Sequence, residues 1–544
     1  MSTTIPTQIE KCKGAMLATA IGDALGWPNE PRSKNRIKKP KVYDFFVEWT
    51  RSCTEPRRHD EKILPGEYSD DTQMMFSVAR SIIAGEWEKF LAEKELPYWL
   101  RYERGGGGAM LKAARSLSDK KVLLWQSTYT KDYFNAGGNG ATMRILPHVI
   151  TYASKPDKTT LMLDVIKDTL ITHGHPRAFL GATCYAYALD YLLRKESVLE
   201  YGELVSAVID GQEEWGAFPN PDVFKNWLGT ASQYAGYDYA RTWEDTRNNM
   251  LRQLEFIKTS LKKGLMQDDV KVMTALECFS TVNGAGDVAT LAAVYLASRY
   301  ATNPVLGIKV PAFSFNADTD TIASITGGLL GMLCGISWIP TEWKMVQDYD
   351  CLVQIAEILL SDDKKAATKT EVSEVKSRNS DWQNSPIGTM RLVETRQAPN
   401  GNYGFVLIKK WRTVLGQTIY TKEFQPADNR PQPQLQNNGQ MRFDTQSQTA
   451  ATEPKTQQSV TKQEAPLETK QKSVEAQNHE RLFKLNTSII NALLEKPEFK
   501  SNITVGKFFK VIRAFLDGDE PVAEVAKRFG LDDGMVNLIK MCVK

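Results

Sequence analysis

The chain has 544 residues, of which 42% are hydrophobic and 24% are charged. This composition is ordinary for globular proteins, so it excludes a fibrous protein or a chain without folded cores, and the length corresponds to three or four domains of roughly 150 residues. The formal net charge is only +3, which gives the chain as a whole little attraction for nucleic acid.

Residues 1–14 lack the apolar stretch of a secretory signal, and the scattered cysteines form no Cys-x-x-Cys pair. We therefore expect a cytoplasmic protein with neither a disulfide framework nor a cysteine zinc site. Through the first two thirds of the chain, apolar residues recur at spacings of three and four, as in Met75, Val78 and Ile82. This periodicity predicts one large all-α domain over residues 1–361.

Residues 67–87 carry two adjacent acids at a predicted helix start. Ser69 is a good N-cap residue and an apolar stripe begins a few residues later, so Asp70 and Asp71 fall in the first turn. The helix dipole stabilises ionised carboxylates there. Such acids either support the helix start or belong to a functional site.

A second acid cluster, with Asp318, Asp320 and Thr321, stands where a glycine-rich apolar helix is predicted to begin. Two carboxylates beside a buried helix would repel each other and lose hydration unless a cation joined them. If the two acid clusters converge, they offer only oxygen ligands, which suits Mg²⁺ or Mn²⁺ and disfavours zinc. Four carboxylates could hold two ions about 3.5–4 Å apart.

The apolar segment that follows, residues 322–339, contains no charge and places Gly327, Gly331 and Gly335 at four-residue spacing. This spacing is typical of contacts between membrane helices, so a membrane span is one interpretation. The acids directly before the segment favour the other interpretation, a buried central helix that packs closely through its glycines.

Charged and small polar residues dominate residues 362–385, which we interpret as a linker. Beyond it the pattern becomes that of β-strands, and residues 389–395, 403–408 and 418–424 predict three short strands in a small β unit over residues 386–425. Because three strands are marginally stable alone, we expect this unit to pack on another part of the chain or on a protein partner.

Residues 426–480 are rich in Gln, Pro, Thr and Lys and predict a disordered linker, because such a segment buries too little apolar area to fold. Helical periodicity returns in residues 481–544, a C-terminal module in which Gly530 has the turn position of a helix-turn-helix unit. Its second helix would begin with Asp532 and Asp533, which DNA phosphates would repel. Contact with a protein is therefore favoured, and nucleic-acid binding is a weaker alternative.

Five motifs resemble, in chain order, those of the ADP-ribosylglycohydrolase family, of the dinitrogenase reductase-activating glycohydrolase type. The resemblance covers about residues 14–335. The motifs are Gly22-Asp23-Ala24-Leu25-Gly26, Ser69-Asp70-Asp71-Thr72, Gly138-Asn139-Gly140-Ala141-Thr142-Met143-Arg144, Thr172-His173-Gly174-His175-Pro176 and Asp318-Thr319-Asp320-Thr321.

This resemblance implies an all-α, ADP-ribosylglycohydrolase-like fold with a binuclear magnesium centre. The metal ligands implied by position are Ser69, Asp70, Asp71, Asp318, Asp320 and Thr321. Catalytic roles are implied for Asp70, Asp71, Asp320 and Glu30. The ribose and diphosphate of a substrate are expected to bind at Gly138, Asn139, Gly140 and His173.

Two motifs leave alternatives open. His173 or His175 could cap or pack a helix instead of touching substrate, and Arg144 could pair with a phosphate or with a buried acid.

These expectations combine into one function and one alternative. The chain is predicted to be a Mg-dependent hydrolase that cleaves the glycosidic bond between ADP-ribose and an acceptor, with metal ions orienting the ribose and activating water. The acceptor could be a protein, a nucleic acid or a small molecule. The alternative is a non-catalytic ADP-ribose sensor that acts as a regulator through its C-terminal module.

Overall fold

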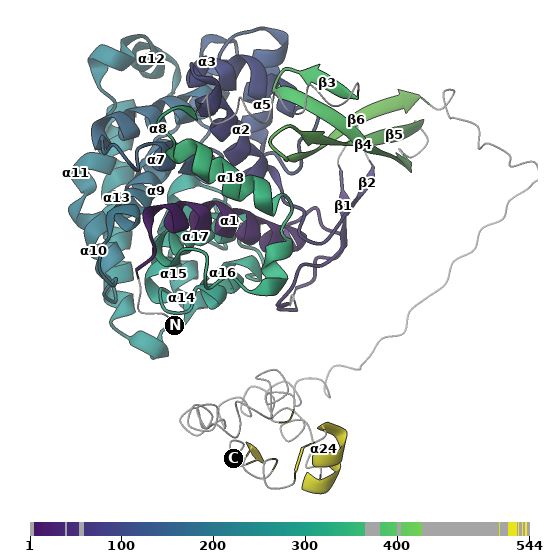
Figure 1. Ribbon diagram of the computed structural model, residues 1–544. Helices are drawn as coiled ribbons and strands as arrows, with labels where there is room; N and C mark the ends of the chain where they lie inside the picture. Colours follow the sequence, from purple (N-terminus) through teal and green to yellow (C-terminus); the bar gives the residue numbers. More distant parts are fainter. Residues whose placement is uncertain are drawn as a thin grey trace, which may run out of the picture. The chain divides into compact units, whose positions relative to one another are not determined.

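The computed structural model describes residues 5–38, 41–53, 59–364, 381–399 and 404–426, and near the C-terminus residues 511, 521–529, 531, 532, 536, 539 and 540. The chain divides into two units, residues 1–435 and residues 436–544. The first unit is mostly helical and contains every residue that the sequence predicts for the site (Figure 1).

The helices described in the first unit are α1 (Gln8–Gly26), α2 (Asp70–Ala84), α3 (Trp87–Phe90), α4 (Leu96–Trp99), α5 (Gly108–Asp119), α6 (Thr130–Phe134), α7 (Leu146–Thr151), α8 (Lys158–Thr172), α9 (Pro176–Arg194), α10 (Glu203–Asp210), α11 (Gln212–Trp215), α12 (Pro221–Tyr234), α13 (Tyr239–Leu261), α14 (Asp269–Ala275), α15 (Gly286–Arg299), α16 (Pro304–Ala312), α17 (Thr319–Cys334) and α18 (Tyr349–Leu360). Short 3-10 or π segments are η1 (Trp27–Asn29), η2 (Leu91–Glu95), η3 (Leu124–Gln126), η4 (Thr142–Arg144), η5 (Gly264–Met266) and η6 (Thr341–Met345).

Helices α1 and α17 form the centre of the first unit, with α9, α15, α16 and α18 packed around them (Figure 1). Both central helices are apolar on nearly every side, which is typical of helices that are buried all round. The prediction of a buried, glycine-rich central helix is therefore confirmed. No helix among the described residues is both long enough and apolar enough to cross a membrane.

Glycines allow the backbones of α1 and α17 to touch. A Cβ atom placed on Gly22 would lie 2.2 Å from the carbonyl oxygen of Ala323, and one placed on Gly327 would lie 2.1 Å from that of Ala18. Any larger residue at these positions would force the helices apart. This close contact brings the end of α1 beside the start of α17.

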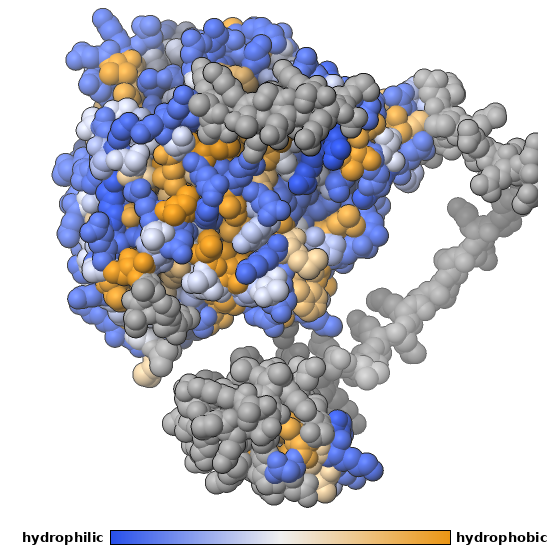
Figure 2. Space-filling model, viewed as in Figure 1, coloured by the Kyte–Doolittle hydropathy of each residue, from blue (hydrophilic) through white to orange (hydrophobic). Residues whose placement is uncertain are grey.

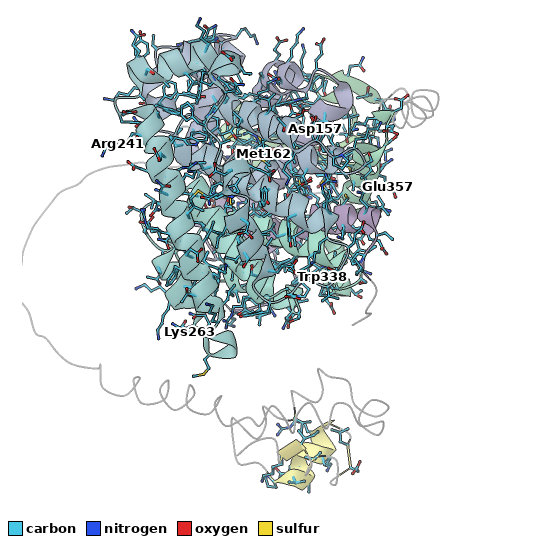
Figure 3. The ribbon with its side chains drawn as sticks, turned by 90° about the vertical axis from the view of Figure 1, so that its left-hand side faces the viewer. Asp157, Met162, Arg241, Lys263, Trp338 and Glu357 are labelled. Carbon is cyan, nitrogen blue, oxygen red and sulfur yellow. The ribbon has the colours of Figure 1, made fainter. Side chains whose placement is uncertain are left out.

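The outer helices give the unit a hydrophilic surface. Helix α13 runs along the outside, and Figure 3 shows Arg241 near its beginning and Lys263 just beyond its end. The face drawn in Figure 2 is largely hydrophilic, with apolar residues gathered mainly near α1 and α18. Helices with one buried side produce this distribution.

A two-stranded antiparallel sheet interrupts the region that we expected to be entirely helical. Strand β1 (Trp49–Ser52) pairs with β2 (Asp60–Ile63), and Arg51 and Glu61 lie opposite each other and are buried. The strand pattern is absent from the sequence here because the charged residues Arg51 and Glu61 occupy buried positions, where an alternating strand has apolar residues. The all-α prediction was wrong for these residues.

A second antiparallel sheet follows the helices and has the order β3-β4-β5-β6. The strands are β3 (Trp382–Ser385), β4 (Gly388–Pro399), β5 (Gly404–Thr413) and β6 (Thr418–Pro426). Three strands were predicted, and the additional strand β3 lies at the end of the expected linker. Ile387, Met390, Trp411 and Ile419 belong to the same apolar core as the helices, so the sheet packs on the helical body as expected.

In the second unit the structure describes helix α24 (Val522–Phe529). Its position matches the first helix of the predicted helix-turn-helix unit. The predicted turn at Gly530 and most of the predicted second helix lie outside the described residues. The linker expected over residues 426–480 also lies outside them, except for Pro426, which ends strand β6.

Candidate active site

The first acid motif caps helix α2. Ser69 is the N-cap residue and its side chain accepts a hydrogen bond from the Asp71 backbone at 3.2 Å, while Asp70 and Asp71 occupy the first turn and are buried. Asp23, on α1, holds this turn in place because its carboxylate accepts hydrogen bonds from the Ser69 and Thr72 backbones at 2.9 and 3.0 Å. The predicted helix start is confirmed.

The second acid motif stands at the start of helix α17 and meets the first. Asp318 is the N-cap residue, and Asp320 and Thr321 follow in the first turn. The Thr321 hydroxyl lies 3.3 Å from Oδ2 of Asp71, and the Ser69 hydroxyl lies 3.3 Å from the same oxygen. Two motifs separated by 250 residues therefore share one carboxylate oxygen.

Glu30 completes the cluster from the segment after α1. One of its carboxylate oxygens accepts hydrogen bonds from both the backbone and the hydroxyl of Thr319 at 2.8 Å. Carboxylate oxygens of Glu30, Asp318 and Asp320 lie within 4.8 Å of one another. The predicted catalytic glutamate is thus placed beside the second acid motif.

The electrostatics of this cluster are unfavourable without a cation. Burial raises the pKa of Asp70, Asp71 and Asp320 well above the usual range, and neighbouring carboxylates raise these pKa values further. Burial and the charge of Asp318 raise the pKa of Glu30 to about 7. Repulsion among buried acids indicates a site built for positive charge.

The oxygen atoms of this cluster fit a hard divalent cation. Oδ1 of Asp71 is buried and has no hydrogen-bond partner among the described residues, so a lone pair is available inside the cluster. All surrounding donors are carboxylate or hydroxyl oxygens, the ligands that Mg²⁺ and Mn²⁺ prefer.

A glycine-containing loop lies directly against the acids. The Asn139 backbone donates to the carbonyl of Gly284 at 3.0 Å, and the Asn139 side-chain amide donates to Oδ2 of Asp318 at 2.9 Å. The ring of His173 packs against Gly138 and Gly140. The structure therefore brings all four predicted substrate-binding residues next to the acid cluster.

The two histidines and Arg144 have distinct environments. Burial and the nearby guanidinium of Arg144 lower the pKa of His173 to about 3, so its imidazole is neutral. His175 caps α9 by accepting a hydrogen bond from the Arg177 backbone at 3.2 Å. Arg144 pairs with buried Asp168 at 2.6 Å and also donates to the carbonyl of Gly140 at 3.2 Å, so the buried-acid interpretation is correct.

Sequence reasoning assigned no role to Asp23, and for the glycine run Gly105–Gly108 at the start of α5 it predicts a hinge or, preferably, a substrate loop. The available signal for Asp23 was that it is a single charge within the apolar run of α1. An isolated acid in a buried helix needs several hydrogen-bond donors around it, so such a residue indicates a structured polar site. Gly105 has a φ of +117°, and a Cβ on it would lie 2.6 Å from Oδ1 of Asp70. Nothing in the local pattern of Gly105–Gly108 indicated this contact.

The structure thus places a buried cluster of carboxylate and hydroxyl oxygens, the groups that hard divalent cations prefer, beside a glycine-containing loop. The sequence profile that matches the chain is that of ADP-ribosylglycohydrolase, over residues 4–368. The chain belongs to the ADP-ribosylglycohydrolase family and is a glycosidic-bond hydrolase that acts on ADP-ribose linkages.

Three relatives illustrate the similarity. The chain is 26% identical over 196 residues to the ADP-ribosylarginine hydrolase Tri1 of Serratia proteamaculans, a match that covers 35% of this chain and 49% of that protein. It is 24% identical over 340 residues to the ADP-ribosyl-[dinitrogen reductase] glycohydrolase of Rhodospirillum rubrum, covering 62% and 90%. It is 22% identical over 359 residues to the ADP-ribosylhydrolase ARH3 of Danio rerio, covering 62% and 86%.

Proposed function

We propose that this protein is a magnesium-dependent hydrolase that releases ADP-ribose from a modified protein side chain. The observation that carries the proposal is the shared oxygen of Asp71, which Ser69 and Thr321 approach from two separate helix starts. The names of the relatives, which include an ADP-ribosylarginine hydrolase, support modified arginine as the first acceptor to test.

Two Mg²⁺ ions, or Mn²⁺ in their place, would be held by Ser69, Asp70, Asp71, Asp318, Asp320 and Thr321. When bound, such cations supply positive charge that fixes the ribose hydroxyls and lowers the pKa of a coordinated water.

Hydrolysis adds water across the bond between ribose C1 and the acceptor atom. The water oxygen becomes bonded to C1, and the acceptor leaves with a proton. Glu30 is the proton carrier that we assign, because a carboxyl with a pKa near neutrality both accepts and returns protons efficiently. Asp70, Asp71 and Asp320 would be ionised with the cations bound, and their charge would balance that of the ions.

The loop at Gly138–Gly140 would bind the ribose and diphosphate. Gly138 and Gly140 have no side chains that would keep a ligand from the backbone, and the Asn139 amide ties the loop to Asp318. Neutral His173 supplies a hydrogen-bonding ring without adding charge. Substrate binding and cation binding would therefore be linked through one hydrogen bond.

The sensor alternative is not favoured. A protein that only binds ADP-ribose has no need of a complete set of cation ligands, whereas every ligand position implied by the family resemblance is occupied here by a suitable oxygen donor.

The experiment is hydrolysis of ADP-ribosylated arginine and serine peptides by the full-length protein. We expect release of ADP-ribose with Mg²⁺, no release with EDTA, and no release by Asp320→Ala. Asp222→Ala is the matched control, since it removes an exposed first-turn acid of α12. Tight binding of ADP-ribose without turnover on any acceptor class would favour the sensor.

A further inference from the structure

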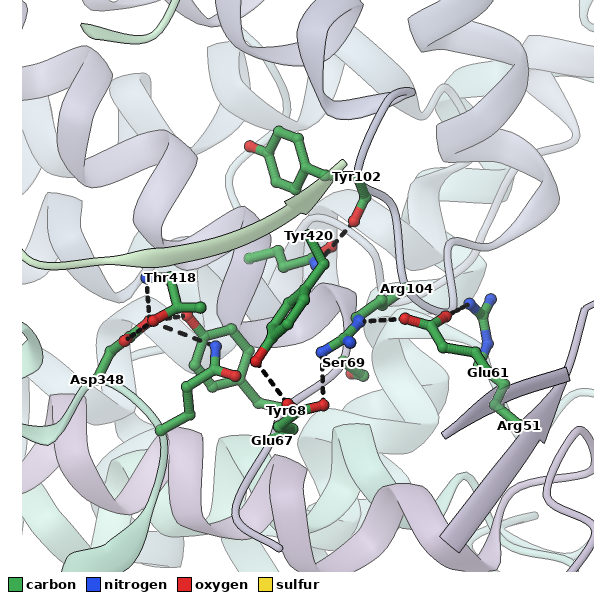
Figure 4. A network of polar contacts seen from close by, with 12 residues as sticks. Arg51, Glu61, Glu67, Tyr68, Ser69, Tyr102, Arg104, Asp348, Thr418 and Tyr420 are labelled. Carbon is green, nitrogen blue, oxygen red and sulfur yellow. Dashed lines mark hydrogen bonds and ion pairs between the residues drawn. The ribbon is translucent and has the colours of Figure 1, made fainter. Parts of the chain in front are cut away.

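The sheet β3–β6 lies beyond residue 368, where the match to the family ends, yet it contacts the segment that carries the first acid motif. Strand β6 makes these contacts through Thr418, Tyr420 and Lys422. Residues at this two-residue spacing point to the same face of a strand. One face of a strand outside the family region is therefore directed at the candidate active site (Figure 4).

Tyr420 makes the central contact. Its hydroxyl donates to Oε1 of buried Glu67 at 2.6 Å, while Oε2 of the same carboxylate accepts from Arg104 at 3.0 Å. The Arg104 guanidinium lies 3.9 Å from the centre of the Tyr420 ring. Glu67 stands two residues before Ser69, and Arg104 directly precedes Gly105, which touches Asp70.

Thr418 holds the next residue of the same segment. Its backbone and its hydroxyl both donate to the Asp348 carboxylate at 2.7 Å, and Asp348 accepts from the Tyr68 hydroxyl at 2.7 Å. Glu67 and Tyr68, the two residues before the N-cap, are thus both fixed by groups that β6 contacts.

Lys422 holds the neighbouring loop. Its backbone donates to the carbonyl of Arg101 at 2.9 Å, and its ammonium donates to that of Glu103 at 3.0 Å and pairs with Glu61 at 2.9 Å. The Glu103 carboxylate in turn accepts from the Gly105 backbone at 3.1 Å. Both segments that border Asp70 are therefore tied to one strand.

The network contains two buried acids, one half-buried acid and three cations. The acids Glu61, Glu67 and Glu103 face Arg51, Arg104 and Lys422. Because these charges balance, the network requires no ion of its own. Its hydrogen bonds and ion pairs hold the segments on either side of Asp70, and it adds no further cation ligand to the acid cluster.

We propose that strand β6 positions the candidate cation site, with Tyr420 fixing the Ser69-Asp70 segment through Glu67 and the Gly105 loop through Arg104. The inference rests on the proposed function, since it concerns how tightly that site binds cations. Tyr420 is a positioning residue, because its hydroxyl bonds Glu67 and none of the acids in the cluster. The predicted β unit then acquires a role: it holds the hydrolase site in its binding geometry.

The test is Mn²⁺ binding to the full-length protein, measured by calorimetry or electron paramagnetic resonance together with the melting temperature. Tyr420→Phe removes only the hydroxyl and should weaken Mn²⁺ binding about 10-fold, at the lower end of the effect of groups that orient metal ligands. Hydrolysis should return toward the wild-type rate at saturating Mn²⁺. Thr418→Val acts through Asp348 and Tyr68 and should also weaken Mn²⁺ binding. It is the second variant to measure where Tyr420→Phe folds poorly.

Tyr295→Phe is the matched control. It also removes a buried phenol that donates to a carboxylate, Asp269, which in turn pairs with Arg299. It should lower the melting temperature by a similar amount and leave Mn²⁺ affinity unchanged. Equal Mn²⁺ affinity in wild type, Tyr420→Phe and Thr418→Val would overturn the inference while leaving the proposed function intact. Wild-type protein that fails to bind Mn²⁺ would overturn both.

Discussion

Replacing Gly22 with alanine tests whether the contact between α1 and α17 builds the site. The added Cβ would lie 2.2 Å from the Ala323 carbonyl oxygen, whereas ordinary contacts begin near 3.4 Å, so the two helices must separate by about 1 Å. Overpacking of this kind lowers the free energy of unfolding by about 3 kcal/mol, and the better helix propensity of alanine offsets up to about 1 kcal/mol of this loss.

The net loss of about 2 kcal/mol corresponds to a melting temperature about 3 °C lower for a unit of this size. Asp23 follows Gly22, and Asp320 lies in the first turn of the opposing helix, so the same movement distorts the acid cluster. A misplacement of about 1 Å can reduce catalysis about 100-fold. We therefore expect weaker Mn²⁺ binding and a large loss of hydrolysis from Gly22→Ala.

The assays are thermal unfolding, Mn²⁺ titration and hydrolysis of an ADP-ribosylated peptide. Gly229→Ala is the matched control, because a Cβ on this glycine of α12 meets nothing within 4 Å. It should raise stability by about 0.5–1 kcal/mol and leave activity unchanged. The reasoning is refuted if Gly22→Ala is as stable as Gly229→Ala and binds Mn²⁺ like the wild type.

Two further predictions concern pH. Because Asp70, Asp71 and Asp320 have raised pKa values in the folded protein, the unfolded chain ionises first as pH rises above about 4, so metal-free protein should lose stability from pH 5 to pH 8. Mg²⁺ should reduce this loss, and melting temperatures in EDTA and in Mg²⁺ would show the same slope if the acids did not bind the ion. His173, with a pKa of about 3, stays neutral above pH 5, so His173→Asn should raise KM without moving the pH profile of kcat between pH 5 and pH 8; a shifted profile would show that the imidazole titrates during the reaction.

The Asn139–Asp318 hydrogen bond joins the two halves of the proposed mechanism. It links the loop that would hold the diphosphate to the N-cap of α17. Binding of the cation and binding of the nucleotide would therefore be coupled. A variant that loses this hydrogen bond is expected to lose affinity for both.

The sequence by itself determined the local features of this protein. The order Ser69-Asp70-Asp71 placed two acids in the first turn of a helix, and the glycine spacing before Gly335 identified a helix that packs closely in the core. Such features depend on neighbouring residues in one segment, so their spacing is sufficient. The family motifs added the site residues, each carried over by its position.

Only the tertiary structure decided which of these segments meet. Thr321 reaches Asp71 because α17 packs backbone to backbone on α1, whose Asp23 holds the start of α2. Arg144 pairs with Asp168 and not with a phosphate because α8 lies beside its loop. The contact between Tyr420 and Glu67 joins residues 353 positions apart. Contacts of this range follow from how whole elements fill a common core, which no spacing within a single segment records.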